Sequence, residues 1–98
     1  MNIKIHSIHF DADQKLEDFI TSKVSKLSQF YESILSAEVY LRLDKAQNTE
    51  NKITEIKIDI PKSNLFAKKQ SASFEAATDS VIEALKRQIT KHKEKIRE

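Results

Sequence analysis

The chain has no glycine in 98 residues, and this absence limits what it can fold into more than any other feature. Glycine adopts positive φ most readily and lets a phosphate approach the backbone closely. The P-loop, the dinucleotide-binding fingerprint, the G-x-S-x-G nucleophile elbow and the clamp loop of the KH module all need it. Most nucleotide-cofactor chemistry is therefore excluded.

Cysteine is also absent, so the chain has no disulfide framework, no cysteine-based zinc site and no thiol nucleophile. Its length suits one domain with one core, and we expect residues 1–98 to act as a single monomeric unit. No stretch approaches the roughly 18 apolar residues of a membrane helix, and no apolar leader stands at the N-terminus. We therefore expect a cytoplasmic protein with no membrane partner.

Alternation of apolar and polar residues predicts four strands. The polar run 45–52 connects the second strand to the third, which favours an antiparallel hairpin. Pro61 ends the third strand, and we expect a shorter fourth strand at the sheet edge, where its lysines discourage pairing with other chains. The four segments are residues 2–6, 37–44, 54–60 and 65–70.

Two further segments have apolar residues at helical spacing. The carboxylates of Asp11 and Asp13 suit the N-cap of the first helix, and Ser73 suits that of the second. The first stripe consists of Leu16, Phe19, Ile20, Val24, Leu27, Phe30 and Tyr31, and the second of Phe74, Ala77, Val81, Ile82, Leu85, Ile89 and Ile96.

The resulting element order is β-α-β-β-β-α. A four-stranded sheet with both helices on its dry face buries every apolar stripe, so the sequence predicts an α+β two-layer sandwich. Its expected core includes Ile5, Phe19, Leu27, Val39, Ile58, Val81 and Leu85.

No group of residues matches a catalytic or metal-binding arrangement. His6 and His9 would point to opposite faces of a strand, and His92 lies among lysines with no acidic partner nearby in sequence. Carboxylates alternate with lysines, as at Glu55 and Lys57, which is typical of a solvated face rather than a general acid–base pair. We expect a protein that is not an enzyme, with no catalytic residue, metal or cofactor.

Positive charge is concentrated at the C-terminal end. Residues 86–98 contain six Lys or Arg against two Glu, a net charge of +4, so residues 1–85 carry −2 of the total of +2. A concentrated basic end on a slightly acidic body suits a polyanion. Basic residues near a helix C-terminus also complement the helix dipole, and composition alone does not separate the two interpretations.

At about 100° per residue, the cations of the second helix fall on two flanks when Leu85 defines the inward direction. One flank carries Lys86, Lys93 and Arg97, the other Arg87, Lys91 and Lys95, with the Thr90 hydroxyl between them. On the first helix, Lys26 lies on the outer face and Lys23 beside the apolar stripe, where its stem can pack. Side by side, the two helices would offer one basic surface to a phosphate backbone.

The open face of the sheet is an alternative RNA surface. Its aromatic and basic residues have the composition of a stacking platform for single-stranded bases, although the glycine-dependent RNP1 motif is missing. Aromatic residues at such positions are more often cross-strand packing partners. The residues concerned are Tyr40, Arg42, Lys57, Phe66 and Lys68.

Residues 85–95, Leu-Lys-Arg-Gln-Ile-Thr-Lys-His-Lys-Glu-Lys, closely resemble the final helix of the short ribosome hibernation promoting factors and the related ribosome-associated inhibitor. This family is also called the sigma-54 modulation or ribosomal subunit interface family. Residues 16–27 resemble its first helix, followed by Gln29, Phe30 and Tyr31. The resemblance covers nearly the whole chain, and the family has the same β-α-β-β-β-α order.

The resemblance implies a factor that binds the small ribosomal subunit at the channel for mRNA and tRNA, covers rRNA and reversibly blocks translation in stationary phase or starvation. The matching basic positions imply rRNA binding by Lys23, Lys26, Arg87, Lys91 and Lys93, and we add Lys86 and Lys95 on charge alone. Because the chain stops at Glu98, it resembles the short form, which depends on a separate ribosome modulation factor for ribosome dimerisation.

Two other functions remain open from the residues. The predicted fold is close to that of double-stranded RNA-binding domains, so a structured or double-stranded RNA-binding module acting off the ribosome would use the same cations. A small protein-interaction domain with an incidental basic tail would have no RNA affinity. Sedimentation with small ribosomal subunits separates these possibilities.

Overall fold

The computed structural model describes residues 1–45 and 49–96, without the side chain of Ile96. That side chain and Arg97, both assigned a position on the second helix above, therefore lie outside the described residues. The elements follow the predicted order: β1 (Asn2–Ser7), α1 (Gln14–Phe30), β2 (Ser36–Leu43), β3 (Lys52–Ile60), β4 (Ser63–Ser71) and α2 (Phe74–Ile96).

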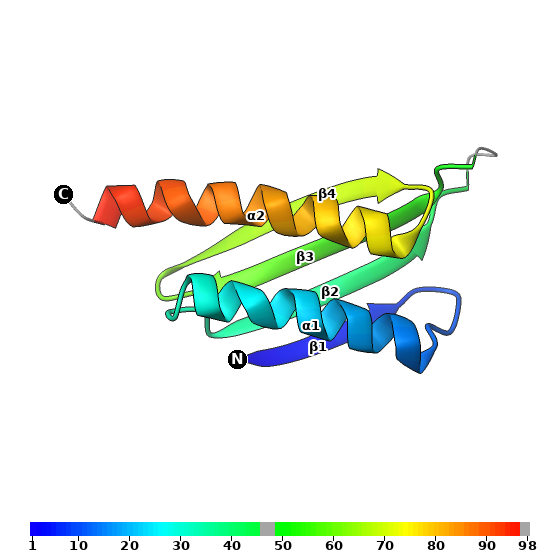
Figure 1. The fold of residues 1–98 in the computed structure, drawn as a ribbon, viewed down its shortest axis with the longest axis horizontal. Coiled ribbons are helices and arrows are strands. Elements are labelled where there is room, and N and C mark those ends of the chain that lie inside the picture. The colour runs from blue at the N-terminus through cyan, green and yellow to red at the C-terminus, as the bar shows by residue number, and fades with distance from the viewer. Residues whose placement is uncertain (46–48, 97–98) are drawn as a thin grey trace.

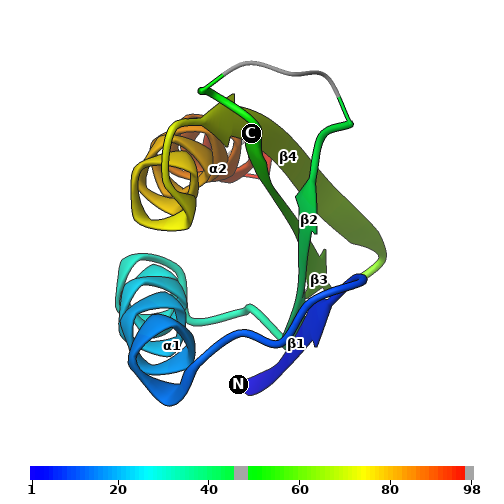
Figure 2. The ribbon, with the colours of Figure 1, turned by 90° about the vertical axis from the view of Figure 1, so that its right-hand side faces the viewer.

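The four strands form one mixed sheet in the order β1-β2-β3-β4 (Figure 1). The β2–β3 and β3–β4 pairs are antiparallel, whereas β1 and β2 are parallel because α1 carries the chain back to the end where β1 began. Both helices lie on the same face of this sheet (Figure 2). The predicted two-layer α+β sandwich and the edge position of β4 are confirmed.

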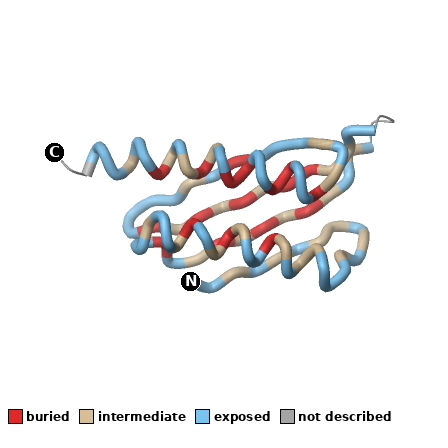
Figure 3. Tube along the Cα trace, in the orientation of Figure 1, coloured by how far each residue is buried: buried red, intermediate tan, exposed pale blue. Residues whose placement is uncertain are grey.

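The core lies between the helices and the inner face of the sheet (Figure 3). Every second residue of β2 and β3 points into it, and α2 packs on β3 and β4 while also contacting α1. Two buried hydroxyls, Thr54 of β3 and Thr78 of α2, lie 3.3 Å apart and satisfy each other. The fully buried apolar residues include Ile20, Val24, Leu27, Val39, Leu41, Ile56, Ile58, Val81, Leu85 and Ile89.

Side-chain caps fix where both helices begin. Asp13 Oδ1 accepts a hydrogen bond from the Leu16 amide at 2.8 Å, and Ser73 Oγ accepts one from the Ala76 amide at 3.0 Å. Each cap satisfies a backbone donor that has no partner within the helix. The capping roles predicted for Asp13 and Ser73 are therefore confirmed.

Without glycine, other residues take the left-handed backbone conformation. Among the described residues, His9 and Lys62 have positive φ, at 65° and 66°. Pro61 and Lys62 form the two-residue connection between β3 and β4, and Lys62 takes the positive φ for which glycine is usual at the second position of a type II turn. A tight hairpin is therefore compatible with the glycine-free sequence.

Three local predictions differ from the structure. The fourth strand runs from Ser63 to Ser71 and is as long as β3, because the two-residue turn lets backbone pairing begin immediately, without apolar side chains to guide it. Ile5 and Phe19 are only partly buried and pack against the margin of the core. Ile5 belongs to an edge strand, and Phe19 lies at the border of the buried stripe of α1, which consists of Ile20, Val24 and Leu27.

Replacing Leu85 by alanine tests the core. Leu85 lies on the inner side of α2 and is fully buried. Leu85→Ala should therefore lower the free energy of unfolding by about 2 to 5 kcal/mol through lost burial and a residual cavity. Denaturant unfolding followed by circular dichroism measures this change. As a control, Phe66→Ala should cost far less, because the Phe66 side chain is 49% exposed; similar losses would contradict the assigned faces.

Candidate nucleic-acid interface

The helical layer carries the predicted basic residues on its outer side. α1 and α2 lie side by side, and the C-terminal turns of α2 project beyond the end of the sheet (Figure 1). Most residues from 90 to 95 are exposed. The predicted RNA-binding residues of both helices therefore lie on one side of the molecule, opposite the open face of the sheet.

A groove of about 370 Å³ runs between the two helices. It brings together three of the predicted RNA-binding residues, Lys23 and Lys26 from α1 and Lys86 from α2. Its remaining lining consists of Ile82, which is nearly fully buried, and two carboxylates that the sequence interpretation did not assign to the site, Asp79 and Glu83.

Two of the groove lysines form ion pairs. Lys23 Nζ lies 3.3 Å from Asp79 Oδ1, across the two helices, and Lys86 Nζ lies 4.0 Å from Glu83 Oε1. Lys23 Nζ also stands 5.4 Å from the centroid of the Phe19 ring, so its ammonium group lies beside the apolar stripe of α1. Lys26 has no ion-pair partner among the described residues and is exposed.

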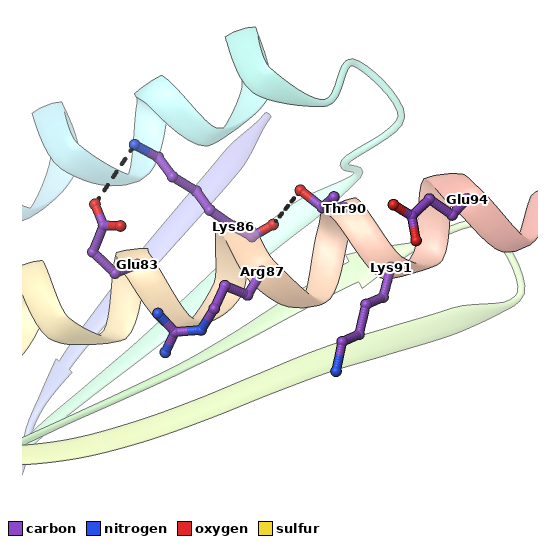
Figure 4. A pocket seen from close by; sticks show the side chains of 6 residues that line it. All are labelled: Glu83, Lys86, Arg87, Thr90, Lys91 and Glu94. Atoms are coloured by element: carbon purple, nitrogen blue, oxygen red, sulfur yellow. Dashed lines mark hydrogen bonds and ion pairs between the residues drawn. The ribbon is translucent and has the colours of Figure 1, made fainter.

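The other flank of α2 carries free cations. Figure 4 shows Lys86 reaching toward α1, whereas Arg87 and Lys91 extend on the opposite side of the helix. With Lys95, these two residues are exposed and have no ion-pair partner within residues 1–45 and 49–96. A shallow hollow of about 390 Å³, lined by Glu83, Lys86, Arg87, Thr90, Lys91 and Glu94, connects this flank to the groove residues.

Lys93 has a structural role that the sequence interpretation missed. The last turn of α1 contains no basic residue, and Lys93 of α2 donates a hydrogen bond to the backbone carbonyl of Phe30, 3.2 Å away, at the end of α1. Its Nζ lies 4.9 Å from the Phe30 ring centroid and 5.9 Å from that of Tyr31. The cation thus complements the negative C-terminal end of the α1 dipole.

Thr90 and His92 also have partners within the protein. The Thr90 hydroxyl, which lies between the two basic flanks, donates to the Lys86 carbonyl at 2.9 Å, the common back-bond of a threonine inside a helix. The His92 ring meets the Tyr31 ring edge-on, with centroids 6.0 Å apart. Neither residue belongs to a group of three or more potential metal ligands among the described residues.

The open sheet face has a different character from the helical side. Tyr40 stacks on His6 with ring centroids 4.9 Å apart, and its hydroxyl donates to Glu38 Oε2 at 2.9 Å. Arg42 forms an ion pair with Glu55, whose side chain is only 12% exposed. The outward positions combine the cations Lys4, Arg42, Lys57 and Lys68 with the carboxylates Glu38, Glu55 and Asp59.

These contacts test two predictions about the sheet. Glu55 was expected to face solvent, but Arg42 covers it, so this part of the prediction is wrong. The Tyr40 ring is already in contact with His6, and cations and carboxylates nearly balance on this face. Cross-strand packing, and not a free stacking platform, is the arrangement found around Tyr40.

Comparison with known protein families finds a match over nearly the whole chain. The profile of the family described as "Sigma 54 modulation protein / S30EA ribosomal protein" matches residues 3–97. The chain belongs to this family. Membership confirms that it is a binding protein and not an enzyme.

Relatives of the family resemble the chain end to end. The ribosome hibernation promoting factor of Klebsiella oxytoca is 30% identical, covering 100% of this chain and 97% of that protein. The factor of the same name from Pseudomonas putida is 27% identical, over 97% of this chain and 89% of that protein.

Two solved structures have the same fold as this chain. A ribosomal subunit interface protein from Coxiella burnetii superposes with a TM-score of 0.85 at 19% identity, covering 95% of this chain and 98% of that chain. The N-terminal domain of Thermus thermophilus Protein Y superposes with a TM-score of 0.79 at 24% identity, covering 94% of this chain and 99% of that chain.

Neither helix of this chain, within the residues that the structure describes, has the length and apolar composition that a membrane span needs.

The contact between Tyr40 and Glu38 predicts a measurable titration. The Tyr40 hydrogen bond, reinforced by His6 and Lys57, lowers the pKa of Glu38 below its usual 4.5, and the same bond raises the pKa of Tyr40. A lowered native pKa stabilises the fold above the unfolded pKa, and this stability is lost as the pH falls through the native value. Tyr40→Phe should therefore raise the pKa of Glu38 and weaken the pH dependence of stability below about 4.5.

Carboxyl chemical shifts followed by NMR against pH measure this change directly. Phe66→Leu, on the same face but without a hydrogen bond to Glu38, serves as the control and should leave the Glu38 titration in place. An unchanged Glu38 pKa in Tyr40→Phe would contradict the assigned contact.

Proposed function

We propose that residues 1–98 form one ribosome-binding domain that binds the small ribosomal subunit at the channel for mRNA and tRNA and reversibly blocks translation in stationary phase or starvation. The observation that carries this proposal is the convergence of Lys23, Lys26 and Lys86 from two helices around one groove, beside the free cations of α2. The names of similar proteins, ribosome hibernation promoting factor and ribosomal subunit interface protein, support the same process.

The proposed mechanism is occlusion without turnover. Cations on two helices that pack against one core keep fixed relative positions, so the domain presents a preformed surface to rRNA phosphates. The bound domain then occupies space that mRNA and tRNA need. The proposed rRNA-binding residues are Lys23, Lys26, Lys86, Arg87, Lys91, Lys93 and Lys95.

Lys93 contributes in two ways under this proposal. Its ammonium group already holds the C-terminal end of α1 against α2, and an ammonium group has three donors, so two remain for phosphate oxygens.

The protein acts in the cytoplasm as a monomer, and ribosome dimerisation, where it occurs, requires a separate ribosome modulation factor.

Reversing two free charges tests the helical interface. Arg87→Glu combined with Lys91→Glu should abolish cosedimentation with small ribosomal subunits, because each change removes an attraction and adds a repulsion in a dense phosphate field. Both side chains are exposed, so the fold should lose only about 0.5 kcal/mol per residue. Circular dichroism confirms that the variant is folded.

The matched control is Lys45→Glu combined with Lys62→Glu, which changes the net charge equally at two exposed positions outside the helices. This variant should keep most of its binding.

The variant Tyr40→Ala combined with Phe66→Ala tests the sheet face and should also bind nearly normally. If the sheet were a stacking platform, the binding free energy would weaken by roughly 1 to 3 kcal/mol per aromatic residue. Loss in the aromatic variant alone would overturn the helical assignment in favour of the sheet face.

Binding to small subunits should depend strongly on salt. Counterion release dominates when phosphates are neutralised by Lys and Arg, so the association constant should fall about a thousandfold between roughly 50 mM and 200 mM salt. Fluorescence anisotropy of labelled protein titrated with small subunits measures this slope. A salt-insensitive interaction would contradict phosphate contacts and indicate docking on ribosomal protein.

A further inference from the structure

The groove lined by three of the proposed RNA-binding lysines also contains two carboxylates. Asp79 and Glu83 line the groove between the helices, where they face three lysines. Glu83 also lines the hollow on the outer side of α2, close to Arg87 and Lys91. Figure 4 shows Glu83 on the side of α2 that faces α1, with its carboxylate joined to Lys86.

These carboxylates contribute little to folding. Their side chains are 54% and 67% exposed, and ion pairs at such exposure stabilise proteins by about 0 to 1 kcal/mol. Neither residue lies in the first turn of α2, which contains Glu75, so the helix dipole does not favour them either. Stability therefore does not account for placing negative charge at a polyanion-binding surface.

The two carboxylates do change the charge of the groove. Two carboxylates against three ammonium groups reduce the groove from a charge of +3 to +1. A phosphate that pairs with Lys23 must compete with Asp79, and one that pairs with Lys86 must compete with Glu83. A strand that offers only phosphates is therefore penalised here.

A structured RNA offers groups other than phosphates. Base amino groups and ribose 2′-hydroxyls donate hydrogen bonds, and carboxylates accept them. Specific binding commonly combines attraction to the correct partner with repulsion of incorrect ones. The two carboxylates provide the repulsive part for phosphate and the attractive part for such donors.

We propose that Asp79 and Glu83 are specificity determinants, which reject phosphate-only contacts in the groove between α1 and α2 and accept hydrogen bonds from base amino or 2′-hydroxyl donors of the structured RNA. This inference rests on the proposed binding to the small subunit. It assigns the phosphate contacts chiefly to Lys26, Arg87, Lys91 and Lys95, the proposed rRNA-binding residues without an internal partner among the described residues.

The test compares two nucleic-acid targets with one variant, Asp79→Asn combined with Glu83→Gln. The side-chain size is kept while both negative charges are removed. Affinity for a short labelled oligothymidylate, which has neither base amino groups nor 2′-hydroxyls, should rise about fivefold per charge removed, the effect of one unit charge at about 4 Å in water. Affinity for the small ribosomal subunit should stay constant or fall, so the ratio of the two affinities should drop at least tenfold.

The control is Glu75→Gln, which removes one exposed carboxylate outside the groove and should change both affinities little and equally. Equal increases for oligothymidylate and small subunits in the double variant would overturn the inference, since they would reflect net charge alone. Unchanged oligothymidylate affinity would overturn it as well. The oligothymidylate arm needs no ribosome, so failure of the unmodified protein to bind small subunits would refute the proposed function separately.

Discussion

Burial of one face of the sheet beneath two helices determines where every other feature of this protein lies. Val39 and Ile58 from the sheet, Leu27 from α1 and Leu85 from α2 all meet in one core. Because neither helix can bury its apolar stripe except against this face, both are held on the same side. Their polar flanks must then point away from the sheet, and the lysines of two distant segments share one surface.

α2 combines two functions along its length. Its N-terminal part, from Phe74 to Ile89, supplies apolar residues to the core, while the last turns project past the sheet with most side chains exposed (Figures 1 and 3). The contact of Lys93 with the end of α1 links the projecting part to the rest of the molecule. The proposed rRNA-binding residues are therefore carried on a scaffold stabilised elsewhere, and we expect their substitution to change binding with little effect on folding.

Local sequence patterns were sufficient for most of the fold. The caps at Asp13 and Ser73 and the β2–β3 hairpin follow from short-range chemistry, and the two flanks of α2 follow from helical spacing. The parallel pairing of β1 with β2, the full length of β4 and the partial exposure of Phe19 did not follow, since each depends on which elements become neighbours. Asp79 illustrates the same limit for the site. Its spacing on α2 places it on the side of Lys86, but only the packing of α1 against α2 brings it to Lys23.

The central claim is that the helical side, and not the sheet, faces RNA on the small ribosomal subunit. Amine-reactive footprinting of the free and bound protein, read by mass spectrometry, tests it at every lysine in one experiment. The account predicts protection of Lys23, Lys26, Lys86 and Lys91, with Lys4, Lys57 and Lys68 on the sheet still reactive. Protection of the sheet lysines while those of the helices stay reactive would contradict it.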